Sequence, residues 1–264
     1  MANWHWQTRQ GQDLLTCDLL QDWYHGFFTR QFWPQTPETL TAALDATAAV
    51  QRVKQVHGNQ VLAPADLPVP DSAEMAEADG LVSDRPGQAL WVCSADCSPV
   101  LIGDRATGQV AAIHAGWRGT AQVIVPVAVS KLQAQGSRLE DLVVAIGPAI
   151  AGEVYQVSVD VAAAVGRTII PQSLGSPDND EAVLADLQQR ENSPVLGDDA
   201  PGKVRLDVRL ANRWQLEQLG LRPEQVAIAP HCTFQEGDRF FSYRRTGEKQ
   251  VQWSGIVSQG AATH

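Results

Sequence analysis

Three residues combine a reactive side chain with a position where a strand pattern meets a turn. They are His57 in KQVHGN, Cys97 in SADCSP and His114 in AAIHAGWRG. Two imidazoles and one thiolate make a three-ligand set for zinc, and they leave a fourth coordination position open for water or substrate, as catalytic zinc sites do. The spacings of 40 and 17 residues match no local zinc-finger pattern. A buried cysteine that acts as a small hydrophobe, with two solvated histidines, is the alternative interpretation.

Asp96 directly precedes Cys97, in the turn before Pro99. Its carboxylate could orient a metal ligand or transfer a proton, which makes Asp96 a candidate catalytic residue. The alternative is a turn aspartate whose side chain caps the loop.

A glycine-rich turn follows the strand pattern that carries His114. Gly116, Arg118, Gly119 and Thr120 belong to the sequence GWRGT, and a helix pattern follows it. Free backbone N–H groups and the helix dipole would converge there with the Arg118 guanidinium, and such groups bind anions. The segment therefore predicts a phosphate-binding loop with Arg118 as a catalytic candidate, and an ordinary turn is the alternative.

Two aromatic runs carry further arginines. Arg30 ends FFTR, and Arg244 and Arg245 end FFSYRR. We expect Arg30 and Arg244 to contribute to a phosphate site, while surface charge is the alternative for all three. Aromatic side chains of these runs could stack on a planar base or fill a core. They are Phe27, Phe28, Phe240, Phe241 and Tyr243.

Turn and cap signals locate the elements that must position these residues. Residues 36–38, Thr-Pro-Glu, predict the start of a helix because they supply a capping hydroxyl, an N1 proline and an early acid. Residues 89–148 predict three strands, a helix that Thr120 caps and Gly136 terminates, and a fourth strand. Residues 207–220 predict an amphipathic helix, because leucine and tryptophan recur near helical spacing before a closing glycine.

Shorter β-rich runs flank these elements. Residues 4–30 predict hairpin strands. Residues 52–62 predict two strands around a turn at His57, Gly58 and Asn59, which would put His57 at a strand end. Closing strands are predicted at 225–230, 240–245 and 249–257.

The mixture of strands and helices favours an α/β (α+β) fold class. The chain has 264 residues, 44% of them hydrophobic, and no Ser/Gly-rich bridge divides it, so we expect one domain over residues 1–264. Because strict βαβ alternation is lacking, the expected architecture is a layered α/β/α sandwich with a mixed β-sheet. The acidic and turn-rich residues 173–202 predict a mobile surface excursion.

Charge and hydropathy restrict the partners. A formal net charge of −10 excludes a nucleic-acid binder that works by bulk electrostatics, because phosphate neutralisation needs clustered Lys and Arg. Small polar molecules are the expected partners. Neither a run of ~18 apolar residues nor a signal-peptide pattern is present, so we expect no membrane association and a cytoplasmic location. The 4 cysteines are then expected to be thiols, which makes any special cysteine a ligand or nucleophile.

Taken together, these blocks resemble the YfiH-type laccase-domain family, also called multicopper polyphenol oxidoreductases. The resemblance covers roughly residues 26–257 and rests on HGFFTR, QVHGNQV, ADGLVSDRPGQALWVCSADCSPVLIGD, AAIHAGWRGT, AIGPAI and CTFQEGDRFFSYRR. It implies an α/β/α-layered fold and a catalytic zinc on His57, Cys97 and His114. It also implies purine nucleoside phosphorylase activity on adenosine, inosine and methylthioadenosine, with some adenosine deamination.

Two segments depart from the family pattern. Residues 31–40 read QFWPQTPETL where the family has a Gly-Gly-Val-Ser type loop, and the acidic insertion at 177–202 has no counterpart in that pattern. The substrate contacts of the first loop therefore do not transfer to this chain.

The family's oxidase name can be tested against the histidine count. A four-copper laccase needs a blue-copper site of two His and one Cys, usually with an axial Met, and many further histidines. This chain has 6 His, and its Met residues are Met1 and Met75, so a self-contained four-copper oxidase is excluded. One Cu²⁺ in place of Zn²⁺ could still support weak polyphenol oxidase (laccase-like) activity. The resemblance leaves a peptidoglycan-precursor editing hydrolase open, and a non-catalytic metal-binding module is a further alternative.

Overall fold

Two six-stranded sheets contain most of the strands. This computed structural model describes residues 3–67, 75–170 and 179–261. In spatial order, the first sheet contains β1 (Trp4–Arg9), β2 (Gln12–Cys17), β3 (His25–Phe28), β15 (Gln252–Val257), β7 (Gln88–Ser94) and β4 (Ala49–Gln51). The second contains β14 (Val226–Ile228), β10 (Leu142–Ile146), β8 (Ser98–Asp104), β9 (Val110–Ala115), β6 (Gly80–Val82) and β5 (Val61–Leu62). Both sheets are mixed, because β4 with β7, β14 with β10 and β5 with β6 pair in parallel.

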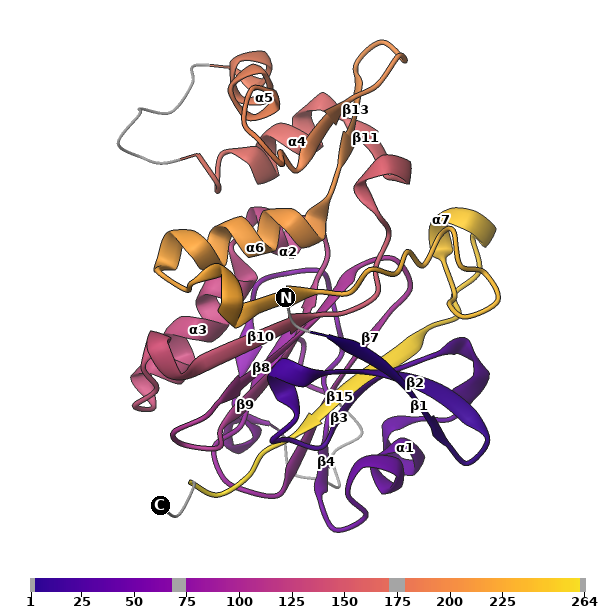
Figure 1. Ribbon diagram of the computed structural model, residues 1–264, viewed down its shortest axis with the longest axis vertical. Helices are drawn as coiled ribbons and strands as arrows, with labels where there is room; N and C mark the ends of the chain where they lie inside the picture. Colours follow the sequence, from indigo (N-terminus) through magenta and orange to yellow (C-terminus); the bar gives the residue numbers. More distant parts are fainter. Residues whose placement is uncertain (1–2, 68–74, 171–178, 262–264) are drawn as a thin grey trace.

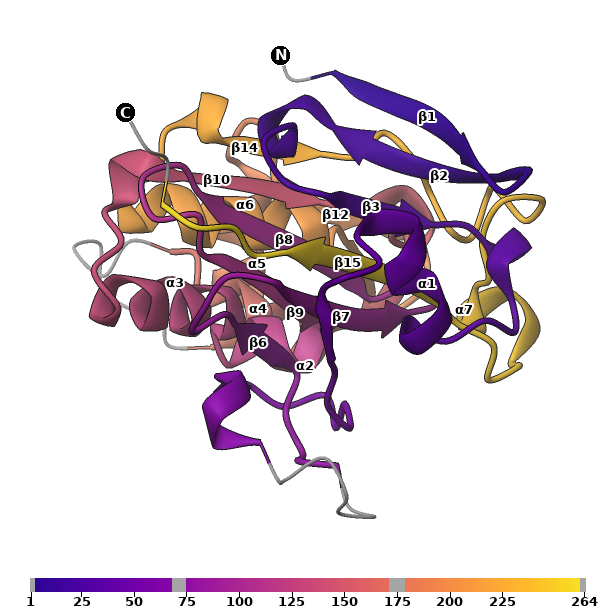
Figure 2. The same ribbon diagram turned by 90° about the horizontal axis from the view of Figure 1, so that it is seen from below.

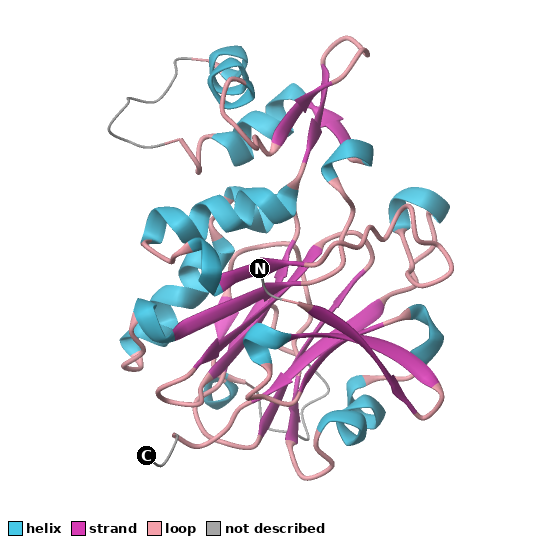
Figure 3. Cartoon of the chain, in the orientation of Figure 1, coloured by secondary structure: helices cyan, strands magenta, loops and turns pink. Residues whose placement is uncertain are grey.

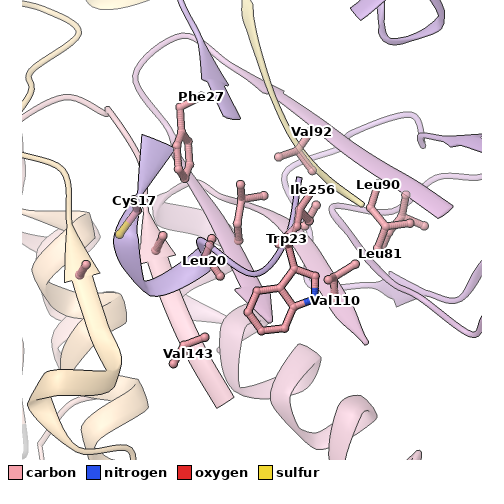
Figure 4. Packing of buried hydrophobic residues seen from close by; sticks show 14 of the residues in the cluster. Cys17, Leu20, Trp23, Phe27, Leu81, Leu90, Val92, Val110, Val143 and Ile256 are labelled. Atoms are coloured by element: carbon pink, nitrogen blue, oxygen red, sulfur yellow. The ribbon is translucent and has the colours of Figure 1, made fainter. Parts of the chain in front are cut away.

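The two sheets pack face to face. Successive side chains of a strand point to opposite faces. Leu90 and Val92 of β7 therefore join one buried cluster with Leu81 and Val110 of the second sheet (Figure 4). Trp91, on the other face of β7, packs against α1 (Pro37–Leu44) and donates from Nε1 to the Thr41 hydroxyl at 3.0 Å.

Helices cover the outer face of the second sheet. Ile102 of β8 shares a buried cluster with Val129 of α3 (Ile124–Ala134) and Leu216 of α6 (Val208–Leu219). The layers are thus α1, the first sheet, the second sheet, and α3 with α6 (Figure 2). The predicted α/β class is confirmed, and two sheets lie between the helical layers where one mixed sheet was expected.

A third sheet forms the upper part of the molecule in Figures 1 and 3. It contains β11 (Gln156–Ser158), β13 (Lys203–Leu206) and β12 (Val195–Gly197), and α4 (Val159–Gly166) and α5 (Asp180–Gln188) pack against it. Of the acidic segment predicted to be a mobile excursion, residues 173–178 lie outside the described residues. The prediction is wrong for the rest, because Val183 and Leu187 of α5 are completely buried in this cluster.

Cap residues explain where several elements begin and end. The predicted helix at Pro37 is confirmed, and α6 begins at the Asp207 cap, whose carboxylate accepts from the Leu210 amide, and ends at left-handed Gly220. The single helix expected between Thr120 and Gly136 is instead α2 (Trp117–Ala121) and α3, because Val123 adopts a left-handed conformation between them. Thr120 therefore lies inside a helix and is not its cap.

One predicted strand and one predicted strand pair are wrong. The run 240–245 does not form a strand, because the Gln252 side chain bonds to both backbone groups of Phe241 and the Ser242 hydroxyl caps α7 (Tyr243–Thr246). The run 52–62 does not form a hairpin, because its first part contains only an isolated bridge at Lys54 and its second part forms β5 of the second sheet. His57 thus lies on a crossing between the two sheets. The hairpin of β1 and β2 is confirmed.

Candidate metal centre

Three chain segments meet where the two sheets join. His57 lies on the crossing from β4 to β5, and Cys97 lies on the crossing from β7 to β8. His114 is the penultimate residue of β9 and pairs in register with Pro99 of β8. Because β8 and β9 are antiparallel neighbours, the beginning of one and the end of the other lie together, which brings His114 beside Cys97.

The three side chains form one cluster. Their candidate ligand atoms, one on each of His57, Cys97 and His114, all lie within 4.8 Å of one another. The two imidazole rings meet edge to face, with centroids 4.8 Å apart. His114 is buried, Cys97 is half-buried and His57 is exposed, so the cluster opens to solvent on one side. Two imidazoles and a thiol at this spacing could hold a metal ion with an open position.

The charges within the cluster favour a thiolate. Burial alone would raise the pKa of Cys97, but the charge of His114 and the hydrogen bonds from His114 and His57 lower it to about 6. Burial would also lower the pKa of His114, yet the Cys97 and Asp79 charges raise it to about 9. The thiolate is the form of cysteine that binds metals, and a bound cation would take the place of the proton that His114 carries in this pair.

Asp79 holds two of the three residues and was missed by the sequence reasoning. Its carboxylate lies 2.9 Å from Nδ1 of His114 and accepts the amides of His57 at 2.9 Å and Gly58 at 2.7 Å. Although burial would raise the pKa of Asp79, these bonds and the His114 charge lower it. A carboxylate on Nδ1 fixes the imidazole with Nε2 free for a ligand role. In the sequence, Asp79 before Gly80 looks like any turn aspartate.

Two glycines allow the segments to approach one another. A Cβ on Gly116 would lie 2.8 Å from the Cys97 sulfur, and one on Gly119 would lie 2.8 Å from the carbonyl oxygen of Gly58. Both distances are too short for a side chain. These glycines thus explain part of the GWRGT motif by close packing around the cluster.

Asp96 connects the Cys97 turn to the C-terminal part of the chain. One carboxylate oxygen accepts from the Thr233 hydroxyl and the other from the Arg244 amide, both at 2.7 Å. Its backbone is left-handed, with φ at 102°. Because both oxygens already accept hydrogen bonds, this geometry favours positioning of Cys97 and Arg244 over proton transfer.

The candidate arginines occupy different settings. The Arg118 guanidinium stacks over Trp117 at 4.5 Å from the ring centroid, and that of Arg244 stacks over Tyr155 at 4.9 Å. Both arginines belong to segments that reach the Cys97 turn: a Cβ on Gly116, two residues before Arg118, would lie 2.8 Å from the Cys97 sulfur, and the Arg244 amide donates to Asp96.

Arg30 and Arg245 are engaged elsewhere. Arg30 stacks over Phe241 and donates to the Gly237 carbonyl. Arg245 donates to the carbonyls of Thr233, Phe234 and Phe240, so it ties the loop before α7 together.

Thr120 and most of the aromatic residues point away from the cluster. The Thr120 side chain is completely buried with its hydroxyl bonded to Asn212, and its amide donates to the Gly116 carbonyl. Neither group is available to a ligand. Most of the aromatic candidates are likewise buried, and among them only Tyr243 is exposed: Phe27, Phe28, Phe240 and Phe241 are each at most 7% exposed.

The fold and the cluster together define a class: an α/β sandwich whose strand crossings gather a candidate His/Cys/His metal site. No helix in the described ranges has the length and apolar character needed to cross a membrane. The family model for multi-copper polyphenol oxidoreductase laccase matches residues 35–258. The chain belongs to this family.

The chain is similar to curated proteins and to a solved structure. It is 52% identical over 258 residues to purine nucleoside phosphorylase slr1573 of Synechocystis sp., which covers 97% of each chain. It is 30% identical over 175 residues to adenosine deaminase RL5 of an unknown prokaryotic organism, which covers 66% of this chain and 60% of the relative. The crystal structure of YlmD from Geobacillus stearothermophilus shares the fold, with a TM-score of 0.76, 24% identity, and coverage of 96% of this chain and 98% of that one.

Proposed function

We propose that this protein is a purine nucleoside phosphorylase that binds zinc through His57, Cys97 and His114. The observation that carries the proposal is the 52% identity to a purine nucleoside phosphorylase along 97% of both chains. The substrates would be a purine nucleoside, such as adenosine, inosine or methylthioadenosine, and inorganic phosphate. The products would be the free base and ribose 1-phosphate.

The donor set supports zinc as the metal. A thiolate and two imidazoles within 4.8 Å of one another suit Zn²⁺ in a three-ligand site, and copper is the alternative that the same donors accept. When bound, the ion supplies Lewis acidity or an activated water. The bond from Asp79 to Nδ1 of His114 leaves Nε2 for the metal.

The anion site would be built on Arg118 and Arg244. Each guanidinium is held flat against an aromatic ring, and Arg244 is fixed further by donation from Nη1 to the Gln156 carbonyl at 2.9 Å. Guanidinium groups bind phosphate through several N–H donors in a fixed plane. The backbone of residues 116–119 and the more distant Arg30 are further candidates. Hydrogen-bond donors that are oriented before the reaction stabilise a charged reactant strongly, because they need no reorganisation when the reaction occurs.

In phosphorolysis, a phosphate oxygen forms a bond to the anomeric carbon of the ribose. The glycosidic C–N bond breaks, its electron pair goes to the purine nitrogen, and that nitrogen takes up a proton. The two arginines would hold the phosphate in line with the sugar, which removes the entropic cost of bringing the reactants together. Asp96 directly precedes Cys97, and it would hold the Cys97 turn against Arg244 through the hydrogen bonds that it accepts from Thr233 and Arg244.

The test is phosphate-dependent release of free base from adenosine, measured together with metal content by mass spectrometry. We expect stoichiometric zinc and base release in the wild type, and loss of both in Cys97→Ala. Cys93→Ala is the matched control, because it removes a thiol that is not among the three candidate ligands and the Gln55 side chain holds the Cys93 backbone. Wild-type zinc content together with wild-type activity in Cys97→Ala would refute the assignment. Zinc without any turnover would favour the editing hydrolase or the non-catalytic module.

Adenosine deamination is the second candidate activity. It rests on the 30% identity to adenosine deaminase RL5. A deaminase would convert adenosine to inosine and ammonia without phosphate. Assays with and without phosphate therefore separate the two reactions.

A further inference from the structure

Tyr155 lies where the chain enters the third sheet, between the short 3-10 turn η5 (Gly152–Val154) and β11. Its amide donates to the Gly152 carbonyl at 3.3 Å, and its carbonyl accepts from the Leu206 amide at 3.1 Å. Leu206 is on the segment that leaves the same sheet. The backbone of Tyr155 is thus held on both sides, by Gly152 before the third sheet and by Leu206 at the end of β13. These bonds fix the position from which the Tyr155 side chain extends.

The Tyr155 ring supports Arg244 in the way that Trp117 supports Arg118. The two guanidinium carbons lie 4.9 and 4.5 Å from the ring centroids. Both rings also pack against the apolar cluster formed by the third sheet with α4 and α5. Two stacked guanidinium groups therefore rest on one apolar base.

The Tyr155 hydroxyl is a further polar group of this arrangement. Within residues 3–67, 75–170 and 179–261, no hydrogen bond engages it. Burial and the charges of Cys97 and Asp96 raise its pKa to about 12, against the opposing effect of Arg244 and Arg118. The hydroxyl is therefore protonated at neutral pH and can donate. A half-buried donor without a protein partner is costly unless a ligand or water completes it.

We propose that the Tyr155 hydroxyl donates a hydrogen bond to the phosphate that Arg244 and Arg118 hold. The identity of this anion rests on the proposed function. Two guanidinium groups supply charge, and the neutral hydroxyl adds a directed contact that water in the open site cannot supply equally well. Tyr155 is then a binding residue for the anionic co-substrate, and the nucleoside is recognised by other groups.

Tyr155→Phe tests this inference, because it removes the hydroxyl and keeps the ring beneath Arg244. We expect the affinity for inorganic phosphate, measured by calorimetric titration of the purified metal-loaded protein, to fall about tenfold. The KM for phosphate should rise by a similar factor while the KM for adenosine stays unchanged. Tyr24→Phe is the control, because it removes the hydroxyl of a tyrosine that is 58% exposed just before β3. Tyr155→Leu, which also removes the ring, should weaken phosphate binding further.

The outcomes separate this inference from the proposed function. Wild-type phosphate affinity in Tyr155→Phe would overturn it, and so would a rise in the adenosine KM alone or an absence of phosphate binding by the wild type. Weaker phosphate binding by Tyr155→Phe in a protein that releases no base would support the inference and refute the phosphorylase assignment.

Discussion

The carboxylate of Asp79 lies 2.9 Å from Nδ1 of His114, and the two side chains are only 0% and 4% exposed. The same carboxylate accepts the amides of His57 and Gly58. One buried group thus fixes two candidate ligands that come from different segments of the chain. The arrangement of the cluster therefore depends on Asp79, which is not one of the three candidate ligands.

Asp79→Asn should weaken metal binding. The amide keeps the shape of the side chain but cannot accept from all three N–H groups, so His114 and the His57 backbone lose their fixed orientation. Loss of a group that orients a ligand typically lowers metal affinity by about 10- to 100-fold. Competition with a chelator of known affinity measures the change.

Glu77→Gln is the control for this substitution. Glu77 lies two residues before Asp79 in the sequence. Its carboxylate is exposed and pairs with Lys54. The zinc affinity of this variant should equal that of the wild type. Equal zinc affinities in Asp79→Asn and the wild type would show that the cluster does not depend on this carboxylate of Asp79.

Gly116→Ala should disturb the cluster by steric contact. The added Cβ would lie 2.8 Å from the Cys97 sulfur, so the thiol must move away from the two imidazoles. We expect metal affinity to fall by about tenfold or more, as it does when a ligand is misoriented. Gly197→Ala is the matched control, because a Cβ there meets nothing within 4 Å. If Gly116→Ala binds zinc as the wild type does, the space at this position is larger than the structure indicates.

The buried His25 should make folding stability depend on pH. Burial lowers its pKa, and its neutral ring accepts from the Cys17 amide and bonds to the Trp23 carbonyl, each at 2.9 Å. The unfolded chain takes up a proton near pH 6.5, whereas the folded chain does so only at lower pH. Stability contributed by neutral His25 is therefore present above pH 6.5 and is lost as the pH falls, at up to about 1.4 kcal/mol per pH unit.

Urea unfolding between pH 7.5 and pH 5 measures this loss. The free energy of unfolding should depend less on pH in His25→Gln than in the wild type. In His5→Gln its dependence on pH should match that of the wild type, because His5 is an exposed histidine paired with Asp18. If the free energy of unfolding changes with pH equally in the wild type, His25→Gln and His5→Gln, other groups cause the pH dependence.

Leu187→Ala should destabilise the third-sheet region. The Leu187 side chain is completely buried between α4 and α5. Truncation of such a leucine removes buried area and leaves a cavity, which costs about 2–5 kcal/mol. Leu196→Ala in β12, where the leucine is 39% exposed, should change the free energy of unfolding by no more than about 0.5 kcal/mol. Equal effects of the two substitutions would mean that α5 does not contribute to a folded core.

The sequence could predict His57, Cys97 and His114 as candidates because each reactive side chain stands at a strand boundary. Pattern alone could not find Asp79, since an aspartate before a glycine has the same local signature whether it caps a turn or accepts from an imidazole 35 residues away. Tyr155 was missed for a similar reason. Its proposed role depends on Arg244, which lies far along the chain and meets Tyr155 only in the folded protein.

Local sequence signals predicted an element well where capping residues determine its ends, as Asp207 and Gly220 do for α6. They failed where tertiary contacts decide. The aromatic run before α7 has the composition of a strand, but the Gln252 side chain takes the backbone bonds of Phe241 that a neighbouring strand would need. Likewise, the composition of residues 52–62 cannot show that this run passes from the first sheet to the second.

The position of β15 determines the order in which the molecule can be completed during synthesis. All three candidate ligands have been made once the ribosome passes His114, yet β15, which lies between β3 and β7, is made more than 130 residues later. Thr233 and Arg244, which hold Asp96, also come from this final part. A nascent chain therefore carries the metal donors long before it has the sheet that fixes them. Insertion of β15 between β3 and β7 would be the event that converts an early, loose set of donors into a rigid centre.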